Sequence, residues 1–129
     1  MAKKKTTILM VDDEPDFIKP MSFWFGSKGY NVVTASSGME ALGKIQKKMP
    51  DIIFLDLRVP GMDGLATLDN IRKISKEVPV IIISAYVEQV TMKDLEPHNI
   101  SGVFYKGKNF EEGLVLVESV LRAHKKLKA

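Results

Sequence analysis

Ionisable and hydroxyl side chains follow or end short apolar runs at four separate points of the chain. Asp12 and Asp13 follow the first run, and Asp56, Ser84 and Lys106 end three later ones. Carboxylates about 5 Å apart repel each other by roughly 3 kcal/mol per pair at an effective dielectric of about 20. A cluster of several carboxylates is therefore unstable without a cation. Magnesium prefers oxygen ligands and commonly bridges carboxylates to a phosphate oxygen. If these side chains meet in space, they predict a magnesium site suited to phosphoryl transfer.

Asp56 is the candidate nucleophile, because it ends a central apolar run and would face both the metal and the lysine. The Ser84 hydroxyl and the Lys106 ammonium would supply a hydrogen bond and an ion pair to a phosphoryl group. Taken singly, each residue has a plainer explanation, since an Asp or Ser after a strand usually caps a turn or a helix and a Lys is usually solvated. The functional interpretation therefore depends on all of them lying at one edge of a sheet.

Short runs rich in β-branched residues alternate with stretches of helical spacing, which predicts a parallel sheet with helices on both faces. The predicted strands are Thr7–Asp12, Asn31–Ala35, Asp51–Asp56, Val80–Ser84 and Gly102–Lys106. In such a sheet, ligands bind beyond the carboxyl ends of the strands. The chemical groups above all stand at those ends, and Glu14 adds a third carboxylate after the first strand.

Five helices are expected between and after these strands. They are Pro15–Lys28, a helix from Ser37 to just before Pro50, Leu65–Ile74, Val87–Leu95 and Phe110–Lys126. Ser37 and Glu40 have the spacing of a capping box, Gly29 is placed to end the first helix, and Pro20 should kink or fray that helix. The side chains expected to face the core are Phe17, Met21, Trp24, Ala41, Leu42, Ile45, Met49, Leu65, Leu68, Ile71, Leu114, Val117, Val120 and Leu121.

The bulk composition indicates one globular unit over residues 1–129. The 45% apolar and 27% charged residues are the balance of a soluble protein, and the longest apolar runs are far too short to cross a bilayer. The chain has no cysteine and no secretory signal pattern, so a cytoplasmic location is expected. The lysines near both ends predict solvated tails and no direct nucleic-acid binding, because no basic stripe runs through the body of the chain.

The longer motifs around these residues resemble those of the receiver domains of bacterial two-component response regulators. The similarity runs from Ile8 to the final helix, and its parts are "ILMVDDEPDF", "PDIIFLDLRVPGMDG", "VPVIIISA" and the lysine that follows the last strand. It implies a flavodoxin-like, doubly wound α/β fold with five parallel strands in the order 2-1-3-4-5 and five helices. The combination of motifs is specific, whereas the Asp-Asp pair alone is not.

The resemblance also implies a role for each site residue. Asp56 would accept a phosphoryl group from a phosphohistidine on a sensor histidine kinase or a histidine phosphotransfer protein. Asp13, Asp56 and the backbone carbonyl of Arg58 would ligate Mg²⁺, with Asp12 acting through water. Ser84 and Lys106 would contact the phosphoryl oxygens, and small Ala85 would leave access to them.

Phosphorylation would then shift the surface formed by the fourth helix, the last strand and the last helix, in a monomer or a phosphorylation-dependent dimer. Pro97 would shorten that fourth helix. The bulky Arg58 and Tyr86 would slow hydrolysis of the phosphorylated form, because they stand where an attacking water would pass.

The last strand departs from the family pattern in two places. Gly107 replaces the usual proline after the lysine, so this loop should be more flexible. Val103 occupies the position of the usual aromatic switch residue, and Tyr105 lies on the same face two residues later.

Two alternative functions stay open. A receiver-like scaffold would bind partners without being phosphorylated, and Val103 and Gly107 motivate this alternative. A magnesium-dependent phosphatase would also use an Asp at a strand end, but such enzymes usually carry a second Asp where this chain has Arg58.

Overall fold

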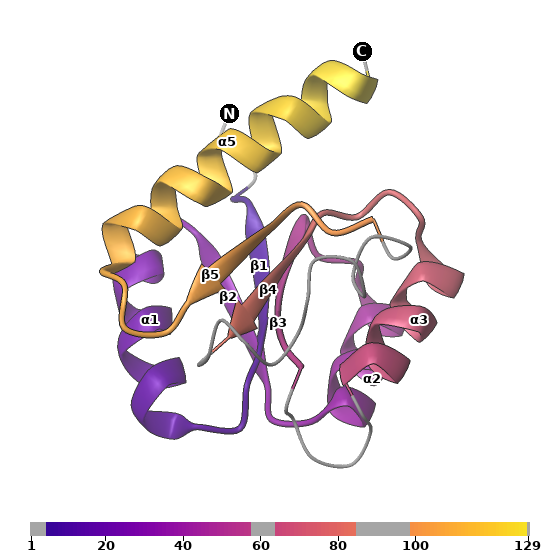
Figure 1. Ribbon diagram of the computed structural model, residues 1–129, viewed down its shortest axis with the longest axis horizontal. Helices are drawn as coiled ribbons and strands as arrows, with labels where there is room; N and C mark the ends of the chain where they lie inside the picture. Colours follow the sequence, from indigo (N-terminus) through magenta and orange to yellow (C-terminus); the bar gives the residue numbers. More distant parts are fainter. Residues whose placement is uncertain (1–4, 58–63, 85–98, 129) are drawn as a thin grey trace.

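The computed structural model describes residues 5–57, 64–84 and 99–128, with the side chains of residues 125–128 left out. Five strands form one parallel sheet in the order β2-β1-β3-β4-β5, as the resemblance implied (Figure 1). The strands are β1 (Thr7–Val11), β2 (Asn31–Ala35), β3 (Ile52–Asp56), β4 (Val80–Ser84) and β5 (Gly102–Tyr105). The described helices are α1 (Pro15–Ser27), α2 (Gly38–Lys47), α3 (Gly64–Ile74) and α5 (Phe110–Lys128). The helix predicted at Val87–Leu95 lies outside the described residues.

The sheet is covered by α1 and α5 on one face and by α2 and α3 on the other (Figure 1). Alternate residues of each central strand therefore enter different cores, and β1 and β3 are buried on both faces. The core under α1 and α5 contains Ile8, Met10, Met21, Phe25, Ile52, Phe54, Ile81, Ile83, Phe104 and Val117. The core under α2 and α3 contains Leu9, Val11, Ala35, Ala41, Ile45, Ile53, Leu55, Leu68, Ile71, Val78, Val80 and Ile82.

Helix α1 ends as Gly29 predicts. Gly29 has a φ of 96°, its N–H donates to Gly26 O at 3.1 Å, and the N–H of Tyr30 donates to Phe25 O at 3.2 Å. These two bonds are a Schellman motif, and the Tyr30 ring packs against Phe25 with centroids 5.7 Å apart. The helix is continuous through Pro20, so no break accompanies that proline.

Helix α2 shows half of the predicted capping box. Ser37 is the N-cap, and its side chain accepts a hydrogen bond from Glu40 N at 3.1 Å. The Glu40 carboxylate turns to Ser36 instead, accepting from its N–H at 2.7 Å and its hydroxyl at 3.0 Å. The prediction that Met49 faces the core was wrong, because α2 ends at Lys47 and Met49 is exposed.

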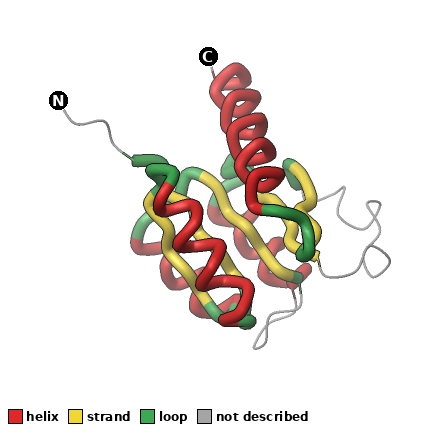
Figure 2. The backbone as a smooth tube through the Cα atoms, turned by 90° about the vertical axis from the view of Figure 1, so that its left-hand side faces the viewer, coloured by secondary structure: helices red, strands yellow, loops and turns green. Residues whose placement is uncertain are grey.

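The carboxyl ends of the strands lie together on the side of the molecule opposite the start of β1 and the end of α5 (Figures 1 and 2).

The prediction that Leu65 faces the core was also wrong. Leu65 is exposed in the first turn of α3, whereas Leu68 and Ile71 are fully buried. Among the described helices, none is both long enough and apolar enough to cross a bilayer.

Candidate functional site

Asp12 stands just past the end of β1, where the backbone is still attached to the sheet. Its N–H donates to Ala35 O at 3.0 Å, and its Oδ1 accepts a hydrogen bond from Glu14 N at 2.9 Å. Glu14 is the N-cap residue of α1, so the same carboxylate links the strand to the start of the helix. The Asp12 side chain is fully buried as a result.

Three carboxylates lie close enough to hold one cation. Oxygens of Asp12, Asp13 and Asp56 lie within 4.8 Å of one another, with Asp12 and Asp56 buried and Asp13 exposed. Among the described residues, Asp12 Oδ2 is a buried oxygen that has an ion-pair contact but no aligned hydrogen-bond donor. A cluster of hard oxygen ligands with one open, solvent-facing side fits Mg²⁺, which prefers oxygen and keeps several waters.

Lys106 reaches this cluster from the turn that follows β5. Its Nζ lies 2.8 Å from Asp12 Oδ2 and 3.2 Å from Asp56 Oδ2, and it also contacts Glu14 Oε1. The lysine side chain is only 14% exposed, whereas that of Glu14 is 60% exposed. The ammonium therefore balances part of the negative charge that Asp12 and Asp56 bring out of water.

The electrostatics of the cluster shift the pKa values of two groups. Burial raises the pKa of the Asp12 carboxyl, and the Asp56 charge adds to this, while contacts with Lys106 and the Glu14 N–H oppose it. Burial alone would lower the pKa of Lys106, but its contacts with Asp12 and Glu14 and the Asp12 and Asp56 charges raise it above its ordinary value. Lys106 therefore keeps its charge at neutral pH.

Ser84 ends β4 beside this site. Its neighbour Ile83 is the register partner of Asp56, and Ser84 itself pairs with Tyr105 of β5. Side-chain alternation assigns Ser84 to the face of Val80 and Ile82, toward α2 and α3. The described geometry thus joins Lys106 directly to Asp56, and the expected contact of Ser84 with a phosphoryl group stays a prediction.

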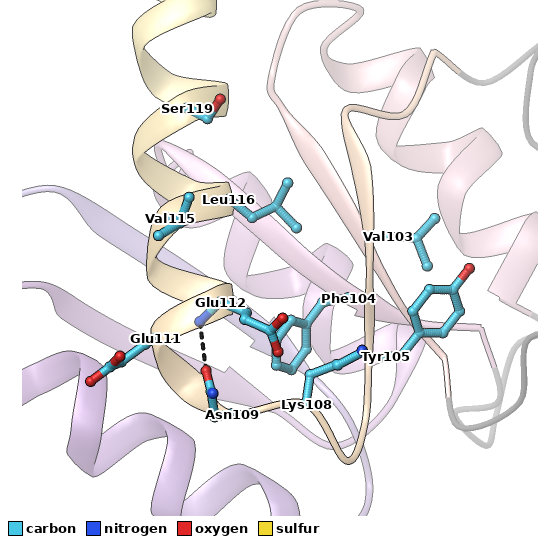
Figure 3. A pocket seen from close by; sticks show the side chains of 10 residues that line it. All are labelled: Val103, Phe104, Tyr105, Lys108, Asn109, Glu111, Glu112, Val115, Leu116 and Ser119. Carbon is cyan, nitrogen blue, oxygen red and sulfur yellow. Dashed lines mark hydrogen bonds between the residues drawn. The ribbon is translucent and has the colours of Figure 1, made fainter.

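Side chains of β5 point in two directions (Figure 3). Phe104 points toward α5, whereas Val103 and Tyr105 point to the opposite face of the strand. Val103 packs against the core under α2 and α3. Tyr105 therefore shares a face with Val103, as the sequence predicts, and its role as a substitute switch residue stays a prediction.

The turn after β5 is defined by hydrogen bonds. Lys106 N donates to Ser84 O at 2.9 Å, and Lys108 N donates to Tyr105 O at 3.1 Å. Gly107 has a φ of 99°, in the left-handed region that proline cannot adopt. The glycine is therefore required by this turn, and the expectation that the loop is more flexible stays a prediction.

The sequence missed two contacts of Lys106. Glu14 was expected in the acidic group but not as a partner of the lysine, and Phe17 was expected only as a core residue. Lys106 Nζ lies 5.0 Å from the centroid of the Phe17 ring. No local pattern signals either contact, because α1 and β5 are far apart in sequence. Arg58, Ala85, Tyr86 and Pro97 lie outside the described residues, so their expected roles stay predictions.

Comparisons with known proteins agree with this fold. Residues 8–118 match the response regulator receiver domain family. The chain is 38% identical over 86 residues to the transcriptional regulatory protein GlrR of Escherichia coli strain K12, covering 67% of the chain and 19% of GlrR. It is 37% identical over 81 residues to sporulation initiation phosphotransferase F of Bacillus subtilis strain 168, covering 63% of the chain and 65% of that protein.

A solved structure gives the same result. Chemotaxis protein CheY4 of Vibrio cholerae aligns with a TM-score of 0.85 at 28% identity, over 91% of this chain and 99% of that one. The chain belongs to the response regulator receiver domain family, whose members are signalling domains of two-component systems and not classical enzymes. It spans about a fifth of the length of GlrR.

Proposed function

We propose that this chain is a phosphorylation switch in which Asp56 accepts a phosphoryl group from a phosphohistidine. The donor would be a sensor histidine kinase or a histidine phosphotransfer protein. The observation that carries the proposal is the contact of Lys106 Nζ with Asp56 Oδ2 at 3.2 Å, beside carboxylate oxygens within 4.8 Å of one another. A nucleophilic carboxylate, a cation site and a fixed ammonium together supply what phosphoryl transfer needs.

Each residue has a separate task in this proposal. Asp56 attacks the phosphorus, and the donor imidazole leaves with the electron pair of the broken P–N bond. Asp13, Asp56 and the backbone carbonyl of Arg58 would hold Mg²⁺, with Asp12 acting through water. Bound Mg²⁺ would neutralise charge on these carboxylates and on the phosphoryl oxygens.

The ammonium and the hydroxyl act on the transferred group. Lys106 would move its ion pair from the Asp56 carboxylate to a phosphoryl oxygen, which costs little displacement because it already contacts Oδ2. Ser84 would donate a hydrogen bond to another phosphoryl oxygen from the neighbouring strand. Slow self-catalysed hydrolysis would then return Asp56 to its free state.

The surface that responds would include the groove between β5 and α5 (Figure 3). This groove of about 600 Å³ is lined by Val103, Phe104, Tyr105, Lys108, Asn109, Glu111, Glu112, Val115, Leu116 and Ser119. Its lining residues lie on both sides of Lys106 in the sequence, with Tyr105 before it and Lys108 after it, so a shift of that lysine would move one wall of the groove. Residues 1–129 would act as one receiver unit in the cytoplasm, as a monomer or a dimer that forms on phosphorylation.

Exposure to acetyl phosphate with Mg²⁺, followed by intact mass measurement, tests the proposal. We expect the wild-type chain to gain one acid-labile phosphate and Asp56→Asn to gain none. Asp51→Asn is a matched control, because Asp51 lies at the opposite end of β3 from Asp56, and it should still be phosphorylated.

The alternative is a receiver-like scaffold that binds partners without phosphorylation. A wild-type chain that stays unmodified, with Mg²⁺ present and the fold intact, would favour this scaffold. The lysine held against Asp56 argues for the switch, because a scaffold has no need to keep an ammonium beside that carboxylate.

A further inference from the structure

The Lys106 ammonium is held from two sides. On one side are the carboxylates of Asp12, Asp56 and Glu14, and on the other is the face of the Phe17 ring, whose centroid lies 5.0 Å from Nζ. An ammonium within about 6 Å of a ring centroid is attracted by the negative face of the ring. The ring therefore completes an enclosure that the carboxylates alone leave open.

The Phe17 ring is itself fixed. Phe17 stands in the first turn of α1, where its N–H donates to Glu14 O at 3.1 Å. Its ring is half-buried and packs against Phe104 with centroids 6.4 Å apart. Phe104 lies on β5 and precedes Lys106 by two residues, so the Phe17 ring contacts both the strand and the lysine that follows it.

The backbone around Lys106 does not by itself fix the position of the lysine side chain, so a contact that orients this side chain would matter. One sheet hydrogen bond, from Lys106 N to Ser84 O, fixes the residue, and the next residue is Gly107 in a left-handed turn. A lysine side chain that is fixed loses rotamer entropy. A fixed aromatic ring that excludes some of the lysine rotamers in the free protein lowers the entropy cost of ordering this side chain.

We infer that Phe17 is a positioning residue that holds the Lys106 ammonium against Asp56. The inference rests on the proposed function, in which this ammonium neutralises the phosphoryl group. Phe17 does not touch the reacting atoms, and it acts through Lys106.

The first measurement needs neither metal nor phosphodonor. In the free protein, the Phe17 ring current should shift the NMR signals of the Lys106 ε-methylene upfield. We expect Phe17→Leu to abolish this shift and Phe17→Tyr to keep it. Phe110→Leu is the matched control, since Phe110 packs on the same face against Trp24, at a centroid distance of 5.9 Å, and should leave the signals unchanged.

The second measurement is the rate of phosphorylation by acetyl phosphate with Mg²⁺. We expect Phe17→Leu to lower the rate by about threefold to fivefold, the size of effect of a partly exposed cation–π contact. Phe17→Tyr should restore the rate, and Phe110→Leu should stay within about twofold of wild type. Phe17→Met replaces Phe17→Leu if the leucine variant loses its native amide spectrum.

The two measurements separate two kinds of failure. If wild type accepts phosphate and Phe17→Leu matches it in both the Lys106 signals and the rate, the positioning role is excluded. If wild type accepts no phosphate, the proposed function fails, and the Lys106 signals alone still decide whether Phe17 holds the ammonium.

Discussion

Gly107 determines how the chain turns after Lys106. Its φ of 99° costs an L-residue roughly 1–2 kcal/mol, and no atom lies within 4 Å of the position that a Cβ would take. The requirement is therefore conformational and not steric. A residue usual in related domains, proline, is fixed near a φ of about −65° and cannot make this turn.

We expect Gly107→Pro to destabilise the protein by more than Gly107→Ala, which should cost about 1 kcal/mol. The proline variant must rearrange the turn, so Lys106 should also lose its contact with Asp56. Denaturant unfolding measures the first effect, and phosphorylation by acetyl phosphate measures the second. A proline variant with wild-type stability and rate would show that this turn is not needed.

At the scale of elements, α3 begins at a close approach between backbones. A Cβ on Gly64 would overlap the backbone of Leu57, which follows Asp56 at the end of β3. Backbone atoms cannot move aside as a flexible side chain can. The start of α3 is thus packed closely against the strand that ends in Asp56, the proposed nucleophile.

We expect Gly64→Ala to lower the free energy of unfolding by about 2 kcal/mol or more, because the added carbon forces β3 and α3 apart. Gly43→Ala is the matched control. Gly43 lies on the exposed side of α2 with no atom near its Cβ position, so alanine should stabilise the helix by roughly 0.5–1 kcal/mol. Equal effects of the two substitutions in urea unfolding would contradict the close approach.

Tyr30, which lies between the end of α1 and the start of β2, makes stability depend on pH. Burial raises the pKa of the Tyr30 hydroxyl above 10.0, and the Glu118 charge adds to the rise. Between the unfolded and folded pKa values, the unfolded chain binds fewer protons than the folded one, so stability falls as pH increases. The fall starts near pH 10 and ends above the folded pKa.

We therefore expect Tyr30→Phe to lose less stability than wild type as the pH rises above about 10. Below pH 9 the difference in unfolding free energy between the two proteins should be constant, because the Tyr30 hydroxyl stays protonated in both the folded and the unfolded chain. Urea unfolding over this pH range gives the comparison, and lysine titration cancels in the difference. Parallel curves up to pH 11 would exclude Tyr30 as the cause.

The elements show what a sequence can and cannot predict. Strand order followed from the resemblance, and β2 and β4 have the predicted bounds because turn residues flank them. The predicted β1 and β5 were each one residue too long at the carboxyl end, where Asp12 and Lys106 keep one hydrogen bond to the neighbouring strand but lie outside the strands. Glu14 and Phe17 were missed as partners of Lys106 because tertiary contacts between distant segments carry no local pattern.

At the scale of the whole molecule, the proposed cation site would couple metal binding to folding. Asp12 and Asp56 are buried, whereas Asp13 and Glu14 are exposed. A cation that binds only the folded chain stabilises it by RT ln(1 + [L]/Kd). Magnesium at ten times its Kd should therefore add about 1.4 kcal/mol.

We expect Mg²⁺ to raise the thermal midpoint of wild type by several degrees and chelation to remove the increase. Asp13→Asn should lose most of this effect at the same Mg²⁺ concentration, because it removes an exposed ligand without breaking a buried ion pair. Asp16→Asn is the control, an exposed acid in the first turn of α1 outside the cluster. A midpoint increase of equal size in both variants would rule out Asp13 as a ligand.

Trp24 is the only tryptophan in the chain, and its ring meets both helices on one face of the sheet. It lies edge-on to Phe25 at 5.2 Å and near Phe110, the first residue of α5, at 5.9 Å, with Lys28 Nζ 5.3 Å above it. The intrinsic tryptophan fluorescence of this protein thus reports on the contact between α1 and the beginning of α5. Trp24 lies in the C-terminal half of α1, whereas Asp12 and Asp13 precede that helix, so we expect cation binding to change the fluorescence through a movement at this contact and not through direct quenching.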